Sequence, residues 1–217
     1  MRTWLLPLIC AILALSPSSS PSKAQSVFAK DGNVFLKNRS GQTMQLTTLG
    51  RDYQASLSPD RRRIAFVRRT SGKTVQTPLG DTEATELWLV DSEGGHLELL
   101  VSGKQGDDPK TILADFSSPQ FSPDGRRIYF MSTGWVTSGA VHVVDIQSKR
   151  ESFVSPGNTL EVIQKGKYRG YLIVQEHKYF FGAKVGSYDH YWLLTPNGKE
   201  IRHIGEERNY RNFKKRV

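Results

Sequence analysis

The sequence predicts an all-β chain built from a repeated four-stranded unit, and two observations support this. The first is a turn-and-strand segment that occurs twice, at residues 57–66 and 121–130, with Ser-Pro-Asp near the start of each copy. The second is a series of an apolar strand, a polar turn, another strand and a glycine, repeated about every 50 residues. These series start at residues 34, 87, 141 and 191. Repeats of this length with four strands each are typical of propeller blades, so we expect a β-propeller of about four blades.

The first 24 residues are expected to be a secretory signal peptide and not part of the fold. Arg2 provides a positive start, and an apolar stretch follows over residues 4–15. Ser22 and Ala24 place small residues where a signal peptidase cleaves. The apolar stretch is too short to cross a bilayer as a helix. Because the one cysteine lies within it, we expect the exported chain to depend on a packed core for its stability.

Each duplicated segment opens with a predicted type I β-turn. Serine suits the first position of such a turn, proline sets φ at the second, and glycine fits the fourth. Because aspartate accepts hydrogen bonds from nearby backbone N–H groups, we interpret Asp60 and Asp124 as turn residues and not as catalytic carboxylates. The predicted structural turn residues are Ser58, Pro59 and Asp60 in the first copy and Ser122, Pro123, Asp124 and Gly125 in the second.

The expected blades follow from the positions of the repeats. The first blade is partial, and its Asp31-Gly32 pair is a strong hairpin signal. No helical period of useful length is found after residue 24, so the basic tail is expected to be loose or to supply the strand missing from the first blade. The expected units are a partial blade at 25–50, full blades at 51–103, 104–157 and 158–205, and a basic tail at 208–217.

The repeat resembles that of a known family. Ser-Pro-Asp-Gly-x-x-Ile-x-Phe at residues 122–130, followed by an apolar strand that ends in Val-Asp, is similar to the WD40-like PD40 repeat of TolB-type propellers. The propeller domains of prolyl oligopeptidase-like enzymes carry the same repeat. The resemblance covers residues 52–157 well, and 25–50 and 160–207 more loosely. It implies six blades preceded by an α/β domain. This sequence departs on both points, so an incomplete ring is among the outcomes that we expect.

Catalytic and metal-binding motifs are missing from the sequence. Without a Gly-x-Ser-x-Gly elbow, the likeness to propeller peptidases does not carry their catalytic residues to this chain. The five histidines lack His-x-x-x-His spacing, and His142 is expected to be a packed or edge residue of a strand and not a ligand. We therefore expect no enzyme activity, no cofactor and no metal. The adjacent Asp189 and His190 are the candidate pair for an alternative function, a glycan lyase or hydrolase built on a propeller.

The chain is basic, with a formal net charge of +9. Its basic clusters lie at residues 61–63 with 68–69, and at 214–216. We interpret both as solvated surface. The alternative is a patch that binds anionic lipid or polysaccharide and weakens as salt rises. Nucleic acid is not an expected partner of an exported protein, and we expect no segment that spans a membrane.

The partner-binding residues are predicted from the topology of a propeller blade. Connections between the second and third strands, and links between blades, lie on one face, which we call the long-loop face. The long connections are residues 70–85, 102–115, 133–139 and 175–189. Long loops that a scaffold holds close together often contain the residues that bind a partner, and aromatic residues dominate binding hot spots. The candidate anchors are Trp135, Tyr179, Phe180, Phe181 and Tyr188.

The sequence thus predicts an exported, non-enzymatic propeller that binds a protein. By resemblance, its compartment is the periplasm and its partner is a protein of the cell envelope. Residues 58–61 and 122–125, with the other short turns, lie on the opposite face, which we call the short-turn face.

Exported protein is expected to begin at Gln25, because Ser22 and Ala24 suit the signal peptidase. N-terminal sequencing of periplasmic material checks this. Recovery of a chain that still begins at Met1 contradicts the prediction.

Overall fold

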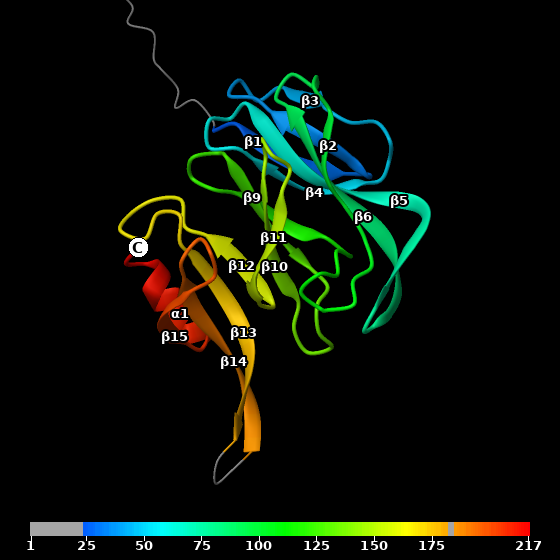
Figure 1. Cartoon of the computed structure of the whole chain (residues 1–217). Coiled ribbons are helices and arrows are strands. Elements are labelled where there is room, and N and C mark those ends of the chain that lie inside the picture. The colour runs from blue at the N-terminus through cyan, green and yellow to red at the C-terminus, as the bar shows by residue number, and fades with distance from the viewer. Residues whose placement is uncertain (1–23, 182–184) are drawn as a thin grey trace, which may run out of the picture.

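The computed structural model describes residues 24–181 and 185–217 of the 217-residue chain, so the predicted signal peptide and its cleavage site lie almost wholly outside the described residues. The described part consists of four antiparallel sheets and a C-terminal helix (Figure 1). The four sheets are the blades of an incomplete propeller, which confirms the predicted fold class.

The first blade has three strands, and each of the others has four in simple sequence order. The first blade contains β1 (Ser26–Lys30), β2 (Asn33–Lys37) and β3 (Thr43–Gln45). The second contains β4 (Asp52–Leu57), β5 (Arg63–Thr77), β6 (Gly80–Asp91) and β7 (Glu98–Ser102). The third contains β8 (Ser117–Phe121), β9 (Arg127–Ser132), β10 (Ala140–Asp145) and β11 (Glu151–Pro156). The fourth contains β12 (Thr159–Val162), β13 (Leu172–Phe181), β14 (Val185–Leu194) and β15 (Glu200–Gly205), and helix α1 (Glu207–Lys214) follows it.

The core lies between neighbouring blades. Blades one and two enclose a cluster that includes Val34 and Phe66. Blades two and three enclose a larger cluster, in which the rings of Phe116 and Phe130 meet edge to face at 4.9 Å. Blades three and four pack through residues such as Tyr129. Because every inner blade is covered on both faces, its strands are apolar on successive residues rather than on alternate ones.

The Ser-Pro-Asp turns have the predicted geometry in both copies. Ser58 Oγ donates to Asp60 Oδ1 at 2.6 Å, and Ser122 Oγ donates to Asp124 Oδ1 at the same distance. These hydroxyl groups hold the pKa of each carboxyl below its ordinary value. The chain then turns through a positive φ at the fourth position, 63° at Arg61 and 69° at Gly125. The hydroxyl and carboxyl groups of both turns therefore bond within the turn itself.

Arginines connect the second, third and fourth blades at the short-turn face. Arg63 Nη2 of the second blade donates to the carbonyl of Gly125 at 2.7 Å. Arg169 Nη2 of the fourth blade donates to the carbonyl of Pro123 at 3.0 Å. The turn of the third blade thus receives a hydrogen bond from each neighbour, which fixes the blades relative to one another on this face.

The first predicted basic cluster is divided by the fold. Arg68 is buried and forms a two-pronged ion pair with buried Asp52, at 2.6 and 2.9 Å, while its guanidinium lies 4.7 Å from the centre of the Trp88 ring. Arg68 is therefore not part of a solvated patch, because the fold places it beside a carboxylate and an aromatic face. In the second cluster, Lys214 pairs with Glu161 at 2.9 Å.

The basic tail is neither loose nor a strand. It forms α1, which lies against the outward face of blade four. Phe213 is buried there, and the ring of Tyr210 stacks on Tyr191 at 4.2 Å. Tyr191 Oη donates to Glu207 at 2.6 Å, and Tyr210 Oη donates to Glu161 at 2.6 Å. The apolar period of this helix is too short to be seen in the sequence, because eight mostly polar residues contain two large aromatics.

No helix in the described ranges has the length and apolar character needed to cross a bilayer.

The turn geometry predicts opposite effects at equivalent positions. Gly125→Ala should lower the free energy of unfolding by about 1–2 kcal/mol, because a Cβ is disfavoured at positive φ. No backbone atom crowds the added Cβ, so the loss reflects the backbone conformation alone. Arg61→Gly should instead raise the free energy of unfolding, because glycine adopts a positive φ without strain. The gain should be smaller than the loss at Gly125, because glycine also increases the conformational freedom of the unfolded chain. Chemical denaturation of both variants checks this, and a neutral Gly125→Ala contradicts it.

Docking of α1 should weaken at alkaline pH. Burial, together with the hydrogen bond to Glu207, raises the pKa of Tyr191 to about 12. Because the pKa of Tyr191 is higher in the folded state than in the unfolded state, Tyr191 stabilises the fold fully below its ordinary pKa of about 10. This stabilisation is lost as pH rises toward the pKa of the folded state. The stability difference between wild type and Tyr191→Phe, measured by denaturation, should therefore shrink above about pH 10. A difference that stays constant to pH 12 contradicts this prediction.

Candidate functional site

The long-loop face contains two extended hairpins and two irregular segments. Residues 70–85 and 175–189 were predicted as loops, but most of them belong to strands. β5 pairs with β6 as far as Thr77 and Gly80, and β13 pairs with β14 as far as Phe181 and Val185. Cross-strand pairing thus continues beyond the body of each blade, as the lower part of Figure 1 shows. The pairing depends on the partner strand, which a local pattern of turn and loop residues does not reveal.

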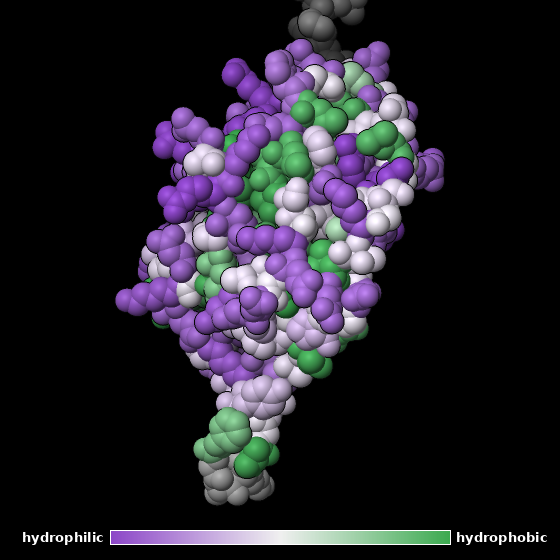
Figure 2. All heavy atoms as spheres, turned by 45° about the vertical axis from the view of Figure 1, so that its right-hand side comes forward, coloured by the Kyte–Doolittle hydropathy of each residue, from purple (hydrophilic) through white to green (hydrophobic). Residues whose placement is uncertain are grey.

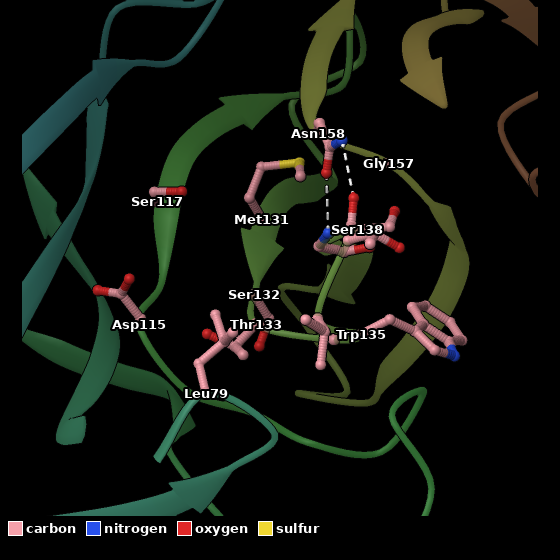
Figure 3. Close-up of a pocket in the computed structure, with 14 residues that line it drawn as sticks. Leu79, Asp115, Ser117, Met131, Ser132, Thr133, Trp135, Ser138, Gly157 and Asn158 are labelled. Carbon is pink, nitrogen blue, oxygen red and sulfur yellow. Dashed lines mark hydrogen bonds between the residues drawn. The ribbon is translucent and has the colours of Figure 1, made fainter. Parts of the chain in front are cut away.

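A cavity of about 300 Å³ opens on this face, mainly against the third blade. Its wall is formed by the 133–139 loop, the approach to β8, the link from β11 to β12, and Leu79 from the end of the β5–β6 hairpin (Figure 3). Asn158 shapes the loop. It accepts a hydrogen bond from the Gly139 amide at 3.0 Å and donates one to the Thr137 carbonyl at 3.2 Å. Asp115 is the one carboxylate among the described residues of the wall.

Trp135 borders the cavity but does not fill it. Figure 3 shows its indole pointing away from the other labelled residues of the wall. The ring is half-buried and meets Phe153 of β11 edge to face at 6.1 Å. Part of the Trp135 ring is therefore covered by Phe153 of the same blade, and the rest of the ring is exposed.

The other four predicted anchors lie together on the β13–β14 hairpin. Tyr179, Phe180 and Phe181 are exposed strand residues, not residues of a connection as the sequence suggested. Tyr188 is half-buried and stacks on Phe180 at 6.3 Å. Tyr179 Oη lies 3.4 Å from Thr137 Oγ1, so the hairpin contacts the loop that carries Trp135. The fold thus gathers all five candidates in one region.

A charged network that the sequence analysis did not detect supports the base of this hairpin. Lys178 Nζ lies 3.0 Å from the carboxylate of Glu176, donates to Glu200, and stands 3.8 Å above the centre of the Trp192 ring. Burial raises the pKa of Glu176. Burial opposes the charge on Lys178, but its hydrogen bonds to the two glutamates raise its pKa overall. Glu176 and Lys178 lie two residues apart and so share one face of β13, which is the sequence signal that could have revealed this network.

Asp189 and His190 do not form a pair. As neighbours on a strand their side chains point to opposite faces, so Asp189 Oδ1 contacts His177 Nδ1 at 2.9 Å and His190 Nδ1 contacts His203 Nε2 at 2.8 Å. Within residues 24–181 and 185–217, no group of three or more histidine, cysteine or acidic residues is placed to hold a metal ion. His142 is fully buried in its strand, so of the two predicted placements, packed or at an edge, the structure has the packed one.

No protein-family model and no curated protein sequence matches the chain. Solved structures do match its fold. Dipeptidyl peptidase 4 of Porphyromonas gingivalis superposes with a TM-score of 0.57 at 15% identity over 88% of this chain. The β-propeller domain of the Trilobed protease of Pyrococcus furiosus, which has an open velcro topology, gives 0.52 at 14% identity over 80%. TolB of Acinetobacter baumannii gives 0.52 at 15% identity over 84%.

The chain spans 32%, 48% and 41% of these three structures, respectively. The likeness to TolB and to other propellers supports the resemblance drawn from the Ser-Pro-Asp repeat. At these identities the likeness establishes a TolB-like β-propeller fold, which peptidases and TolB share, and leaves activity to be argued from this chain's own residues.

Proposed function

We propose that this protein is an exported, non-enzymatic propeller that binds a protein partner of the cell envelope through its long-loop face. The observation that carries the proposal is the aromatic end of the β13–β14 hairpin. Tyr179, Phe180 and Phe181 are exposed there on successive residues, and contiguous exposed apolar surface marks interaction sites. Aromatic residues held on a stiff scaffold are typical of binding hot spots.

The cavity supports binding in preference to glycan hydrolysis. Hydrolysis of a glycosidic bond ordinarily uses two carboxylates that flank the bond. Asp115 has no second carboxylate beside it in the described wall of the cavity. The alternative pair, Asp189 and His190, is divided between two faces of the hairpin. The polar groups of Asn158 are already engaged by the backbone of the 133–139 loop, where they hold its shape.

The proposed compartment is the periplasm. Support comes from the predicted signal peptide and from the resemblance to TolB-type propellers, which implies an envelope location. The absence of cysteine after residue 24 is compatible with an exported chain whose stability comes from its core.

The experiment compares two faces of the folded protein. Phe180→Ser with Phe181→Ser should weaken capture of the envelope partner by about 30-fold or more, the effect of losing a hot spot. Arg61→Glu with Arg62→Glu, on the short-turn face, should leave capture unchanged. Pull-down from envelope extract followed by affinity measurement on the captured protein provides the readout, and circular dichroism confirms that both variants are folded. Loss of capture in the arginine variant alone would place the recognition surface on the short-turn face.

A further inference from the structure

A second cavity lies on the outward face of the fourth blade, beside α1. Its volume is about 620 Å³, against about 300 Å³ for the cavity on the long-loop face. Its wall comes from three segments: the connection between β12 and β13, strand β15, and α1 with the residues that follow it. Figure 1 shows the C-terminus beside the β12–β13 connection, on the same side of the molecule as α1. We call this cavity the cationic pocket, after the side chains of Lys167, Arg202, Arg208 and Arg216 in its wall.

The four cations of this pocket have no acidic partner. No aspartate or glutamate belongs to the described wall, where the carboxylate of Val217, the last residue, is the one negative group. Every acidic residue of the sequence lies within residues 24–181 and 185–217, and none of them forms an ion pair with these four side chains. The pocket therefore gathers positive charge from three separate segments of the chain and leaves most of it unneutralised.

The other cations of α1 are placed differently. Arg211 pairs with Glu207 at 2.8 Å, and Lys214 has its own glutamate partner. Both lie in the last turn of the helix, where the partial negative charge of the helix end favours a cation. Arg208 lies in the first turn, where the partial positive charge of the helix end disfavours it. Helix stability thus accounts for the paired cations and does not account for Arg208, and departures of this kind are typical of functional sites.

Aromatic rings form the floor of the cationic pocket and position two of its cations. Phe213 is buried, and the ring of Tyr168 lies 5.8 Å from the Phe213 ring. The guanidinium of Arg202 lies over the Phe213 ring at 5.6 Å, and the ammonium of Lys167 lies over the Tyr168 ring at 5.4 Å. Contact with a ring face holds a cation electrostatically and leaves its N–H groups for the oxygen atoms of a ligand.

Phosphate is the anion that this set of donors fits best. Three guanidinium groups present planar forks of N–H donors that match phosphate oxygens, and the lysine adds a point charge. A phosphate monoester carries a charge of about −1.5 to −2 at pH 7, whereas a single carboxylate would neutralise one cation of the four. The side-chain amides of Asn209 and Asn212, also in the wall, are further donors. The volume falls within the range of small-molecule pockets, roughly 300–1,000 Å³, and leaves room for the group that bears the phosphate.

We infer that the cationic pocket binds a phosphate-bearing ligand. The inference goes beyond the proposed function because it concerns α1 and the outward face of the fourth blade. Protein capture was assigned to the β13–β14 hairpin, whose lower part carries hydrophobic residues in Figure 2. A soluble phosphate ester and a phospholipid headgroup offer the same chemistry to the pocket, and the experiment distinguishes them.

The experiment titrates the full chain with inorganic pyrophosphate by isothermal calorimetry, at low and high salt. Wild type should bind pyrophosphate saturably, with an affinity that falls as salt rises, because the charges of this open pocket are screened. Arg208→Gln should weaken binding by about tenfold, the effect of losing one charge-assisted hydrogen-bonding group.

Flotation with phosphatidylcholine vesicles that contain phosphatidic acid identifies the source of the phosphate. Vesicle binding that Arg208→Gln weakens assigns the pocket to a lipid headgroup. Absence of vesicle binding, or vesicle binding that Arg208→Gln leaves unchanged, assigns it to a soluble phosphate ester.

Lys215→Gln is the matched control. Lys215 is an exposed cation at the C-terminal end of α1 and does not line the cationic pocket. Its substitution removes the same charge from the same segment, so the affinity for pyrophosphate should stay close to that of wild type. Thermal unfolding should be similar in all three proteins, because neither side chain has an ion pair to lose.

Three results overturn the inference: absence of saturable pyrophosphate binding by wild type, unchanged affinity in Arg208→Gln, or an equal loss of affinity in Arg208→Gln and Lys215→Gln. The last result would mean that pyrophosphate responds to the net charge of the protein and not to this pocket. Capture of the envelope partner is tested separately with Phe180→Ser and Phe181→Ser, so either proposal can fail while the other stands.

Discussion

Each inner blade is stabilised by packing that covers both of its faces. In a closed ring every blade is covered by its neighbours, but an incomplete ring leaves two outward faces. The fourth blade buries its outward face, around Leu193, beneath α1. The first blade has only three strands, and its outward face carries Phe28 stacked on Phe35 between polar and lysine side chains. The fourth blade is therefore covered by a helix, and the first blade has a small, mainly polar outward face. Terminal repeats of repeat proteins likewise have a polar outer face.

The two faces of the ring differ in how their backbone is held, and this difference bears on function. On the short-turn face, tight turns are tied together by Arg63 and Arg169, which leaves little freedom for a variable surface. On the long-loop face, strands continue past the core, and Lys178 of β13 contacts Glu176 and, across the sheet, Glu200 of β15 at the base of the β13–β14 hairpin. Pre-organised surfaces lose less conformational entropy on association, so these contacts are compatible with the binding function proposed for the long-loop face.

Local chemistry by itself determined much of the architecture. The Ser-Pro-Asp turns are held by hydrogen bonds between residues near in sequence, so the positions of these two turns could be predicted without knowledge of the fold. The spacing of the repeats predicted propeller blades because every blade repeats the same strand-and-turn pattern. The apolar neighbours of His142 placed it in a strand, although they left open whether it would be packed or at an edge. The long-loop face was likewise predictable, since the alternation of short and long connections follows from an up-and-down blade.

Tertiary structure decided what depends on partners distant in sequence. Strand pairing beyond the body of the blade turned the loop predicted at 175–189 into a hairpin, because a backbone edge is satisfied only by another strand. Burial beside Asp52 removed Arg68 from the surface. The pleat of β14 separated Asp189 from His190, although they are adjacent in sequence. A short polar tail became a helix only because the uncovered face of blade four offered it an apolar surface, since a helix of eight residues is not stable without tertiary packing.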